Sequence, residues 1–335
     1  MAVLRADVVG AAERLGFPEW ERSRLQQVED ELRLPDNAEE LLAYCGVQAA
    51  DREEMLAARP DPDSDPDWWT ITSALSAEVT RDLGQALPPS GFTSWPAVPP
   101  DASAVGLFAG AWALLANLPR LLELHAQRGV PESITVVTVA ALGQQLATHR
   151  RTFGRAGTGL STMWTAPLRF RGAEYEIGRH GYTRTQLGLG DGVSGHVLSM
   201  HIPPSGALDV HASEQSVAAA VESFGHWFPE EPLSGFVCHS WLLDPQLAEY
   251  LRPDSNIIRF QQRFDLLPQL PVADPSDGDR DLLRLGLQLP VPADALTEEG
   301  LGRIPQDTTL QRAFVAHLRA GRHWYHRTGM LKKWR

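Results

Sequence analysis

A histidine closes one of the strands expected in the second half of the chain. Residues 196–202 alternate between two faces with a period of two, and His201 lies near the carboxyl end of the run. An imidazole exchanges protons near neutral pH, and the ligands of open α/β sheets gather at the carboxyl ends of strands. His201 is therefore a candidate general base. A histidine that only fixes a neighbouring loop would give the same pattern, so both interpretations stay open.

The run Cys238-His239-Ser240 lies in the next expected strand, over residues 236–242, and invites interpretation as a nucleophile with its base. Neighbouring strand residues point to opposite faces, so His239 cannot easily activate either neighbour. We therefore expect no covalent intermediate. Ser240 is instead a candidate hydrogen-bond donor to the reacting centre, whereas Cys238 is more typical of a small core residue.

Two carboxylates, Glu174 and Glu176, share one face of an earlier expected strand. Either could bind a cationic group or act through water, and a solvated strand face is the alternative interpretation. The chain holds two cysteines, Cys45 and Cys238, which lie far apart in the sequence. A zinc site needs clustered ligands, so the sequence predicts no metal.

A helix is expected over residues 213–228. Its first turn contains Ser213, Glu214 and Ser216, which suit an N-terminal cap. The free amides and the dipole of such a helix end also favour an anion, such as a phosphate group. Capping and anion binding explain these serines equally well.

The elements that would position these side chains change character near Arg150. Residues 1–150 show the apolar spacing of helices, and residues 151–335 show mostly strand patterns. The expected elements are helices over 107–127, 133–148, 213–228, 245–251 and 308–320, and strands over 168–171, 175–177, 196–202, 236–242, 257–264 and 282–289. We therefore predict two domains, an all-helical one over 1–150 and a mixed α/β one over 151–335.

Charge and composition restrict the partners of the chain. The formal net charge is −12, and an acidic surface repels nucleic-acid phosphates and anionic lipids. The first residues lack a basic region followed by an apolar core, so no signal peptide is expected. The most apolar stretch, residues 105–124, contains Asn117, Pro119, Arg120 and Glu123, which a lipid-spanning helix rarely tolerates together. A cytoplasmic protein without nucleic-acid or membrane partners is expected.

Four segments follow one another in the second half of the chain: Trp164 to Tyr182, then His201-Ile202-Pro203, Cys238-His239-Ser240-Trp241-Leu242-Leu243 and Ser255-Asn256-Ile257. Together with the order of strands and helices, they resemble a bacterial acyltransferase family. Its members join a helical N-acyltransferase N-terminal domain to a GNAT-like C-terminal domain. The turn Gly129-Val130-Pro131 and the helix after it resemble the N-terminal partner, so the resemblance covers most of the chain.

The resemblance implies a GNAT-like fold and an N-acyltransferase. Its donor would be a thioester, with acyl-coenzyme A as cosubstrate, and its acceptor an amine on a small molecule or a peptide. The amine would attack the thioester directly, which calls for a base, support for the oxyanion and an acid for the thiolate. His201 or a carboxylate such as Glu176 would be the base. Ser240 and strand amides would polarise the carbonyl, and Tyr250 lies where GNAT enzymes often place the acid.

The resemblance also implies contacts with the two substrates. The donor contacts are Ile202, Ser213, Gln215 and Ser216, and the acceptor contacts are Glu174, Arg179 and His239. Two positions depart from the family pattern. Gly181 replaces an expected glutamine, and the loop of residues 203–212 holds only Gly206, where GNAT enzymes cradle the coenzyme pyrophosphate in a glycine-rich loop. An acyl carrier protein is therefore a second candidate donor, and a non-catalytic GNAT-like binding module or partner scaffold is the alternative function.

Overall fold

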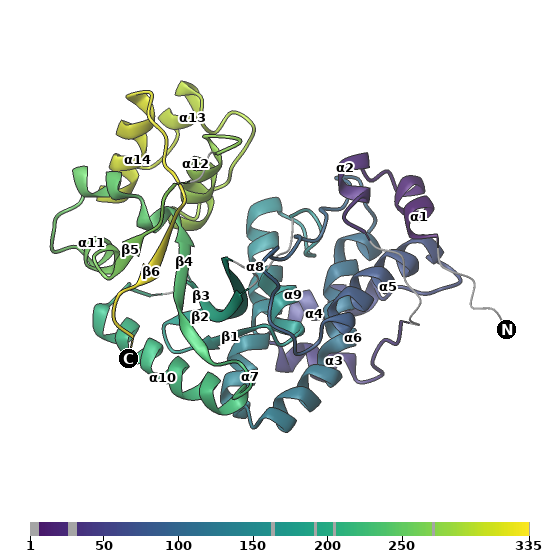
Figure 1. The fold of residues 1–335 in the computed structure, drawn as a ribbon. Helices are drawn as coiled ribbons and strands as arrows, with labels where there is room; N and C mark the ends of the chain where they lie inside the picture. The colour runs from purple at the N-terminus through teal and green to yellow at the C-terminus, as the bar shows by residue number, and fades with distance from the viewer. Residues whose placement is uncertain are drawn as a thin grey trace. The chain divides into compact units, whose positions relative to one another are not determined.

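The computed structural model describes residues 7–25, 32–161, 165–190, 193–203, 206–269 and 272–334 (Figure 1). The chain divides into two compact units. The first comprises Met1–Glu176 and Thr183–Gln186, and the second comprises Ile177–Tyr182 and Leu187–Arg335. The division expected from the sequence, at residue 150, lies within a helix of the first unit.

Helices make up most of the first unit. They are α1 (Val8–Arg14), α2 (Glu19–Arg22), α3 (Ala38–Tyr44), α4 (Ala49–Ala57), α5 (Pro66–Arg81), α6 (Ala104–Arg128), α7 (Glu132–Val139), α8 (Ala141–Phe153) and α9 (Thr165–Phe170), followed by strand β1 (Glu174–Ile177). The central helix α6 begins after the cap Ser103 and ends at Gly129, which adopts a left-handed conformation with φ of 71°. By length and composition α6 could cross a membrane, but 72% of its apolar window is buried, as is typical of a core helix.

Sequence patterns describe this unit unevenly. The helix expected over residues 107–127 is confirmed by α6, and the one expected over 133–148 is two helices, α7 and α8. The strand expected over 168–171 is wrong, because these residues belong to α9 and the turn after it. Residues 166–170 are all buried, so no polar face marks the helical period in this short run.

The second unit contains most of a mixed sheet. Its elements are β2 (His180–Gly190), β3 (Val193–His201), α10 (Val210–Trp227), β4 (Leu233–Ser240), η1 (Trp241–Leu243), η2 (Pro245–Glu249), α11 (Asn256–Gln261), β5 (Phe264–Leu266), α12 (Asp277–Asp281), η3 (Leu282–Gly286), α13 (Glu298–Gly302), α14 (Thr309–Arg319) and β6 (Arg327–Leu331). The strand order is β1-β2-β3-β4-β6-β5. The pair β3–β4 is parallel, and β6 runs antiparallel to both β4 and β5.

The mixed α/β class is confirmed, whereas two expected strands are wrong. Residues 257–264 are mostly helix α11, because Ser255 caps the helix by accepting a hydrogen bond from the Ile258 amide. Residues 282–289 begin with the helical turn η3 instead of a strand. A short apolar run is compatible with either a helix or a strand, so its caps and its neighbours determine which of the two forms. The short helix expected after Asp244 is confirmed by η2, with Pro245 at its first position.

Helix α10 lies along one face of the sheet (Figure 1). Aromatic side chains fill the space between them. The Tyr182 ring of β2 packs edge-on against Phe224 of α10 and Phe236 of β4, with ring centroids 6.4 and 5.7 Å apart. Trp334, after β6, packs against Phe236 at 5.6 Å. We call this side the covered face. Burying such large rings is the main force that holds α10 on the sheet.

Candidate active site

The parallel strands β3 and β4 separate at their carboxyl ends. The last paired residues are Ser199 and Val237, although β3 continues to His201 and β4 to Ser240. Beyond Val237, β4 is paired with β6 on its other side. The separated strand ends are therefore a place where backbone groups of β3 and β4 can meet a ligand that lies between them.

His201 and His239 project from the same face of the sheet at this separation. Directly paired strand residues share a face, and so do residues two positions apart. The pairing of Ser199 with Val237 therefore places His201 and His239 on one side. We call this side the open face, because its side chains are half-buried or exposed. It comprises Ser199, His201, Val237, His239, Thr328 and Met330.

Polar neighbours hold His239 from the side of β6. Its Nδ1 lies 2.8 Å from Oγ1 of Thr328, and its ring stacks on His326 with 5.3 Å between ring centroids. Nε2 of His326 lies 3.1 Å from Oδ2 of Asp281. Partial burial lowers the pKa of His239, and the charge of His326 lowers it further against the opposing charge of Asp281. His239 is therefore a neutral imidazole near pH 7.

Cys238 and Ser240 point to the covered face, together with Phe236. Cys238 is fully buried, and burial raises the pKa of its thiol to about 12, so it is the inert core residue that the sequence predicts. Oγ of Ser240 accepts a hydrogen bond of 3.1 Å from the amide of Leu242. The hydroxyl hydrogen of Ser240 stays available for donation, and its role at the reacting centre stays a prediction.

Helix α10 begins at Val210, three residues before the expected start. Its cap is Asp209, whose Oδ1 accepts a hydrogen bond of 2.8 Å from the amide of Ala212. The prediction that Ser213 caps this helix is therefore wrong, because a cap must precede the first helical turn.

Ser213 and Ser216 instead fasten α10 to strand β2, and both are buried. Oγ of Ser213 lies 2.7 Å from Nε2 of His180 and accepts a hydrogen bond of 2.6 Å from Arg263. Oγ of Ser216 lies 2.8 Å from the hydroxyl of Tyr182 and donates to the carbonyl that ends β1. Their hydroxyls are engaged inside the unit, so these serines position α10, and their direct contact with a donor stays a prediction.

Arg179 organises the loop before α10. Its guanidinium donates to the carbonyls of Pro203, Gly206 and Ala207 at 3.0, 3.3 and 2.9 Å. One planar group thus fixes three carbonyls of a loop that holds a single glycine. The predicted contact of Arg179 with an acceptor stays a prediction.

The other two expected donor contacts lie near the same helix. Ile202 is half-buried after β3 and packs against the apolar cluster around Trp241. Gln215 is exposed on α10, where its Nε2 lies 3.0 Å from Nε2 of His211. Their contact with a donor stays a prediction.

Glu174 and Glu176 hold a buried ion-pair cluster in the first unit. Arg169 donates to both carboxylates at 2.9 Å, and Thr183 donates to Glu174 at 3.0 Å. Burial alone would lower the pKa of Arg169, but the two carboxylates outweigh it and raise that pKa. Glu174 is fully buried, and the side chain of Glu176 is 17% exposed. Both carboxylates thus have a cationic partner in the structure, and their predicted roles in catalysis and acceptor binding stay predictions.

Tyr250 packs against the apolar cluster around Trp241. Its hydroxyl lies 3.0 Å from Nδ1 of His317, and its ring contacts those of His317 and Trp324. Nε2 of His317 faces the carbonyl of His323 at 3.2 Å, so Nδ1 is the acceptor for the tyrosine hydroxyl. The proton of Tyr250 is directed to His317 in this structure, and its predicted role as acid for the thiolate stays a prediction.

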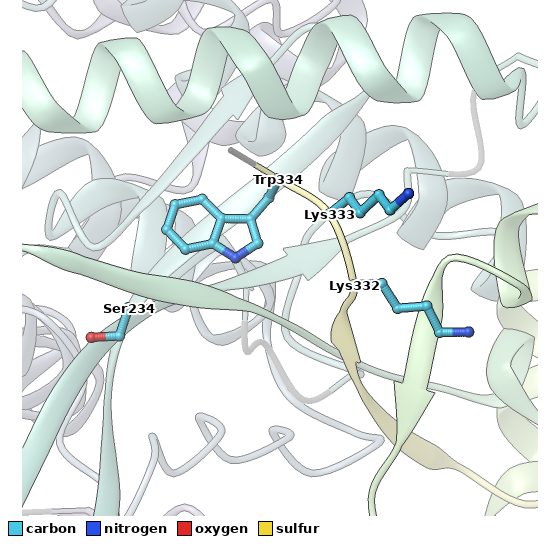
Figure 2. A pocket seen from close by; sticks show the side chains of 4 residues that line it. All are labelled: Ser234, Lys332, Lys333 and Trp334. Atoms are coloured by element: carbon cyan, nitrogen blue, oxygen red, sulfur yellow. The ribbon is translucent and has the colours of Figure 1, made fainter.

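A surface hollow of about 380 Å³ lies at the other end of β4. Ser234, Lys332, Lys333 and Trp334 line it, and Figure 2 shows both lysine side chains extending away from the indole. The antiparallel pairing of β4 and β6 places this hollow at the opposite end of the strand from Ser240. Among the described residues, no group of three or more His, Cys, Asp and Glu side chains could hold a metal.

Two family models match the chain, one to each half. Residues 36–172 match the N-acyltransferase N-terminal domain, and residues 174–331 match the GNAT-like C-terminal domain. The matches meet next to β1, where the two compact units divide. The chain thus has the architecture of an acyltransferase with a GNAT-like catalytic domain.

Solved structures agree over the full length. An acyltransferase in complex with decanoyl-CoA and teicoplanin is 32% identical with a TM-score of 0.81, and the match covers 97% of this chain and 99% of that one. An acyltransferase with decanoyl-CoA is 34% identical with a TM-score of 0.80 and the same coverage. A mutant acyltransferase with octanoyl-CoA is 32% identical, with a TM-score of 0.82 and the same coverage. A search of curated proteins found no match. The chain belongs to this acyltransferase family and is an N-acyltransferase.

Three residues near the site escaped sequence reasoning: Arg263, Asp281 and His326. Arg263 lies 50 residues from its partner Ser213. The strand pairing brings His326 beside His239 from the far end of the chain. No local spacing reports such pairs, and only the cluster of aromatic and basic residues around His326 marked that segment as unusual.

Proposed function

We propose that this N-acyltransferase takes its acyl group from acyl-coenzyme A and transfers it to an amine of a peptide-like small molecule. Full-length likeness to acyltransferases in complex with decanoyl-CoA, octanoyl-CoA and teicoplanin supports this pair of substrates. The observation that carries the proposal is the loop before α10, which presents unpaired amides at a helix N-terminus.

The phosphate-binding part of the site is argued from peptide geometry. The N–H and C=O of a trans peptide point in opposite directions. The carbonyls of Gly206 and Ala207 face Arg179, so the amides of Ala207 and Leu208 point away from it. In the part of the chain that the structure describes, neither amide has a hydrogen-bond partner. Together with the amides of the first turn of α10, they are candidate donors to a pyrophosphate.

A cation lies beneath the same helix turn. Arg263 donates to Ser213 and forms no ion pair with a carboxylate among the described residues. Burial lowers the pKa of Arg263, and the charge of Glu214 opposes that effect. A partly buried guanidinium without an ion-pair partner favours an anion nearby. Arg263 therefore adds positive potential where the loop amides would hold the phosphates of coenzyme A.

The reacting carbonyl would lie between the separated ends of β3 and β4. Strand amides, with the hydroxyl of Ser240, would donate to the oxyanion as the amine attacks the thioester carbon. His201 accepts a proton from the attacking nitrogen, the C–S bond breaks, and the thiolate leaves as the protonated thiol. Because the amine attacks directly, much of the rate enhancement comes from holding donor and acceptor in reacting geometry.

The acceptor is the less defined substrate. Teicoplanin in complex with a similar acyltransferase supports a peptide-like amine as the first compound to try. An acyl carrier protein as alternative donor stays a proposal of lower rank, because the amides at the start of α10 suit the pyrophosphate of free coenzyme A.

Calorimetry and turnover together test this proposal. Decanoyl-CoA is expected to bind at micromolar concentration, and free thiol is expected to appear when teicoplanin or a panel of amino sugars and peptide amines is added. Mass spectrometry should show one added decanoyl group on the acceptor. Binding without transfer to any amine would favour the non-catalytic module. Transfer only from decanoyl carrier protein, without binding of decanoyl-CoA, would overturn the coenzyme assignment.

A further inference from the structure

Acyl transfer to an amine requires two separate proton removals. An aliphatic amine resembles the lysine side chain and is mostly an ammonium ion at neutral pH, so it must lose one proton before it can attack. After the C–N bond forms, the same nitrogen carries a second proton that must leave. The departing thiolate takes up one proton, so each turnover releases one net proton to solvent.

Two imidazoles lie on the open face beside the separated strand ends. His201 is half-buried at the end of β3, and His239 is exposed on β4, on the same open face. A half-buried base can return its proton to the leaving sulfur, whereas an exposed base can pass a proton to water. The pair therefore offers two different fates for the two protons.

The contacts of His239 leave one ring nitrogen for a substrate. Its Nδ1 lies against the hydroxyl of Thr328, and no partner of its Nε2 is present among the described residues. The His326 ring stacks on it, and Asp281 holds His326 from behind at 3.1 Å. Thr328 and His326 both come from β6 and the residue just before it, so this segment holds the ring by a polar contact and by stacking. Such support is typical of a side chain that must keep one orientation.

We propose that His239 removes the first proton, from the ammonium group of the acceptor, and that His201 removes the second. In the first step the N–H bond of the ammonium breaks, the free amine remains, and Nε2 of His239 becomes an imidazolium that releases its proton to water. In the second step His201 takes the proton from the tetrahedral adduct. That proton then goes to the thiolate sulfur as the C–S bond breaks. The inference rests on the proposed amine acceptor.

Several charged groups act on His239 from the elements around it. His201 lies on the same face of the sheet at the end of β3, and His326 stacks on His239 just before β6. Asp281 lies behind His326, and Arg284 donates to Asp281 at 2.6 Å. The charge of His326 opposes protonation of His239, and that of Asp281 favours it. The balance keeps His239 unprotonated, as a base must be before it accepts a proton.

The pH dependence of two variants separates the two histidines. His239→Gln is expected to lower kcat/KM for teicoplanin with decanoyl-CoA by about 100-fold at pH 6.5 and by less than about threefold at pH 9.5. At pH 9.5 about a tenth of a lysine-like amine is already neutral, against about one part in ten thousand at pH 6.5. His201→Ala is expected to stay slow at both pH values. Imidazole added to His239→Ala should restore part of the rate at pH 6.5. Equal losses for His239→Gln at both pH values would overturn the proposal.

A titration that needs no turnover gives an independent measure. In protein with labelled histidines, the NMR signal of His239 is expected to titrate below the ordinary histidine range. His326→Phe keeps the stacked ring but removes its charge, so the titration midpoint of His239 should rise. His226→Phe, at an exposed site on α10, is the matched control and should leave that midpoint unchanged. An unchanged midpoint in His326→Phe would contradict the inference even where no acceptor reacts. Absence of turnover in the wild type would count against the proposed substrates alone.

Discussion

The two faces of the sheet in the second unit carry similar polar side chains with opposite surroundings. On the covered face, His180 and Tyr182 are fully buried and bonded to Ser213 and Ser216 of α10. On the open face, His201 and His239 are half-buried or exposed beside the separated strand ends. A buried histidine serves as a structural hydrogen-bond partner, whereas a partly exposed histidine can exchange a proton with substrate or water.

The covered histidine shows the physical reason. Burial lowers the pKa of His180 to about 3, with the charges of Arg179 and Arg263 acting in the same direction. Such a ring stays neutral through the physiological range and cannot carry a proton for a reaction. His180 begins β2 and His201 ends β3, so their positions in the sequence do not distinguish a structural histidine from a catalytic one. The difference is that helix α10 covers the ring of His180.

The largest effect on catalysis is expected for His201→Ala, at the open face. Loss of a positioned general base lowers kcat by about 10² to 10⁴, because the attacking nitrogen then has no acceptor for its proton. The measurement is thiol release with decanoyl-CoA and an accepted amine at several pH values. His196→Ala, on the paired part of β3, serves as the control and should keep its kcat within about threefold. A normal rate in His201→Ala would place the base elsewhere.

The ion-pair cluster of the first unit should affect the stability of the protein and leave its catalysis unchanged. Arg169→Ala leaves the carboxylates of Glu174 and Glu176 without their cationic partner. It is expected to lower the free energy of unfolding by about 3–5 kcal/mol. Glu176→Gln keeps one ion pair and should lose less. Urea denaturation measures both, and kcat of Glu176→Gln at saturating substrates should equal that of the wild type. A large fall in kcat with unchanged stability would support Glu176 as a catalytic residue.

The sequence predicted the large features of this fold because they depend on long patterns. Helix α6 and strand β3 extend over enough residues for their periods to show, and Asp244-Pro245 marks a helix start by type alone. The short elements failed for the opposite reason. Four to eight apolar residues, as at 168–171 and 282–289, fit a buried helix as well as a strand.

The candidate site was predictable where one strand determines it and not where distant segments meet. His201 follows from the alternation of β3 and its end position. The ion pairs of Glu174 and Glu176 depend on Arg169, which lies in a segment expected as a strand. The glycine-poor loop depends on Arg179, which no glycine pattern reveals. The local pattern of one sequence therefore does not show which distant side chain pairs with a candidate residue.

Acid should weaken the covered face through His180. The unfolded chain binds this proton near pH 6.5, but the folded protein binds it only near pH 3. Stability therefore falls as the pH drops below 6.5, by about 1.4 kcal/mol per pH unit, or about 2 kcal/mol at pH 5. His180→Gln should remove that part of the fall in urea unfolding between pH 7 and pH 5. His125, with a pKa lowered by burial to about 4, should keep a similar dependence in the first unit. An unchanged acid response in His180→Gln would mean that this ring is not the buried neutral group.

The smallest effect is expected for substitution of Arg179, which holds the loop before α10. Arg179→Ala releases three carbonyls, so the amides of Ala207 and Leu208 lose their fixed direction. The dissociation constant for decanoyl-CoA should rise about tenfold, or about 1.4 kcal/mol, with kcat at saturation nearly unchanged. Arg179→Lys should be nearly as weak, because an ammonium cannot bridge three carbonyls in one plane.

Arg252→Ala removes the same charge from an exposed position and controls for long-range attraction of the phosphates. If Arg252→Ala weakens binding as much as Arg179→Ala, general electrostatics is the cause and the loop is not held by the guanidinium. If only Arg179→Ala does so, one arginine supplies the order that several glycines give in other GNAT-type loops. A loss of kcat without a change in the dissociation constant would instead support the contact of Arg179 with the acceptor, as the sequence first indicated.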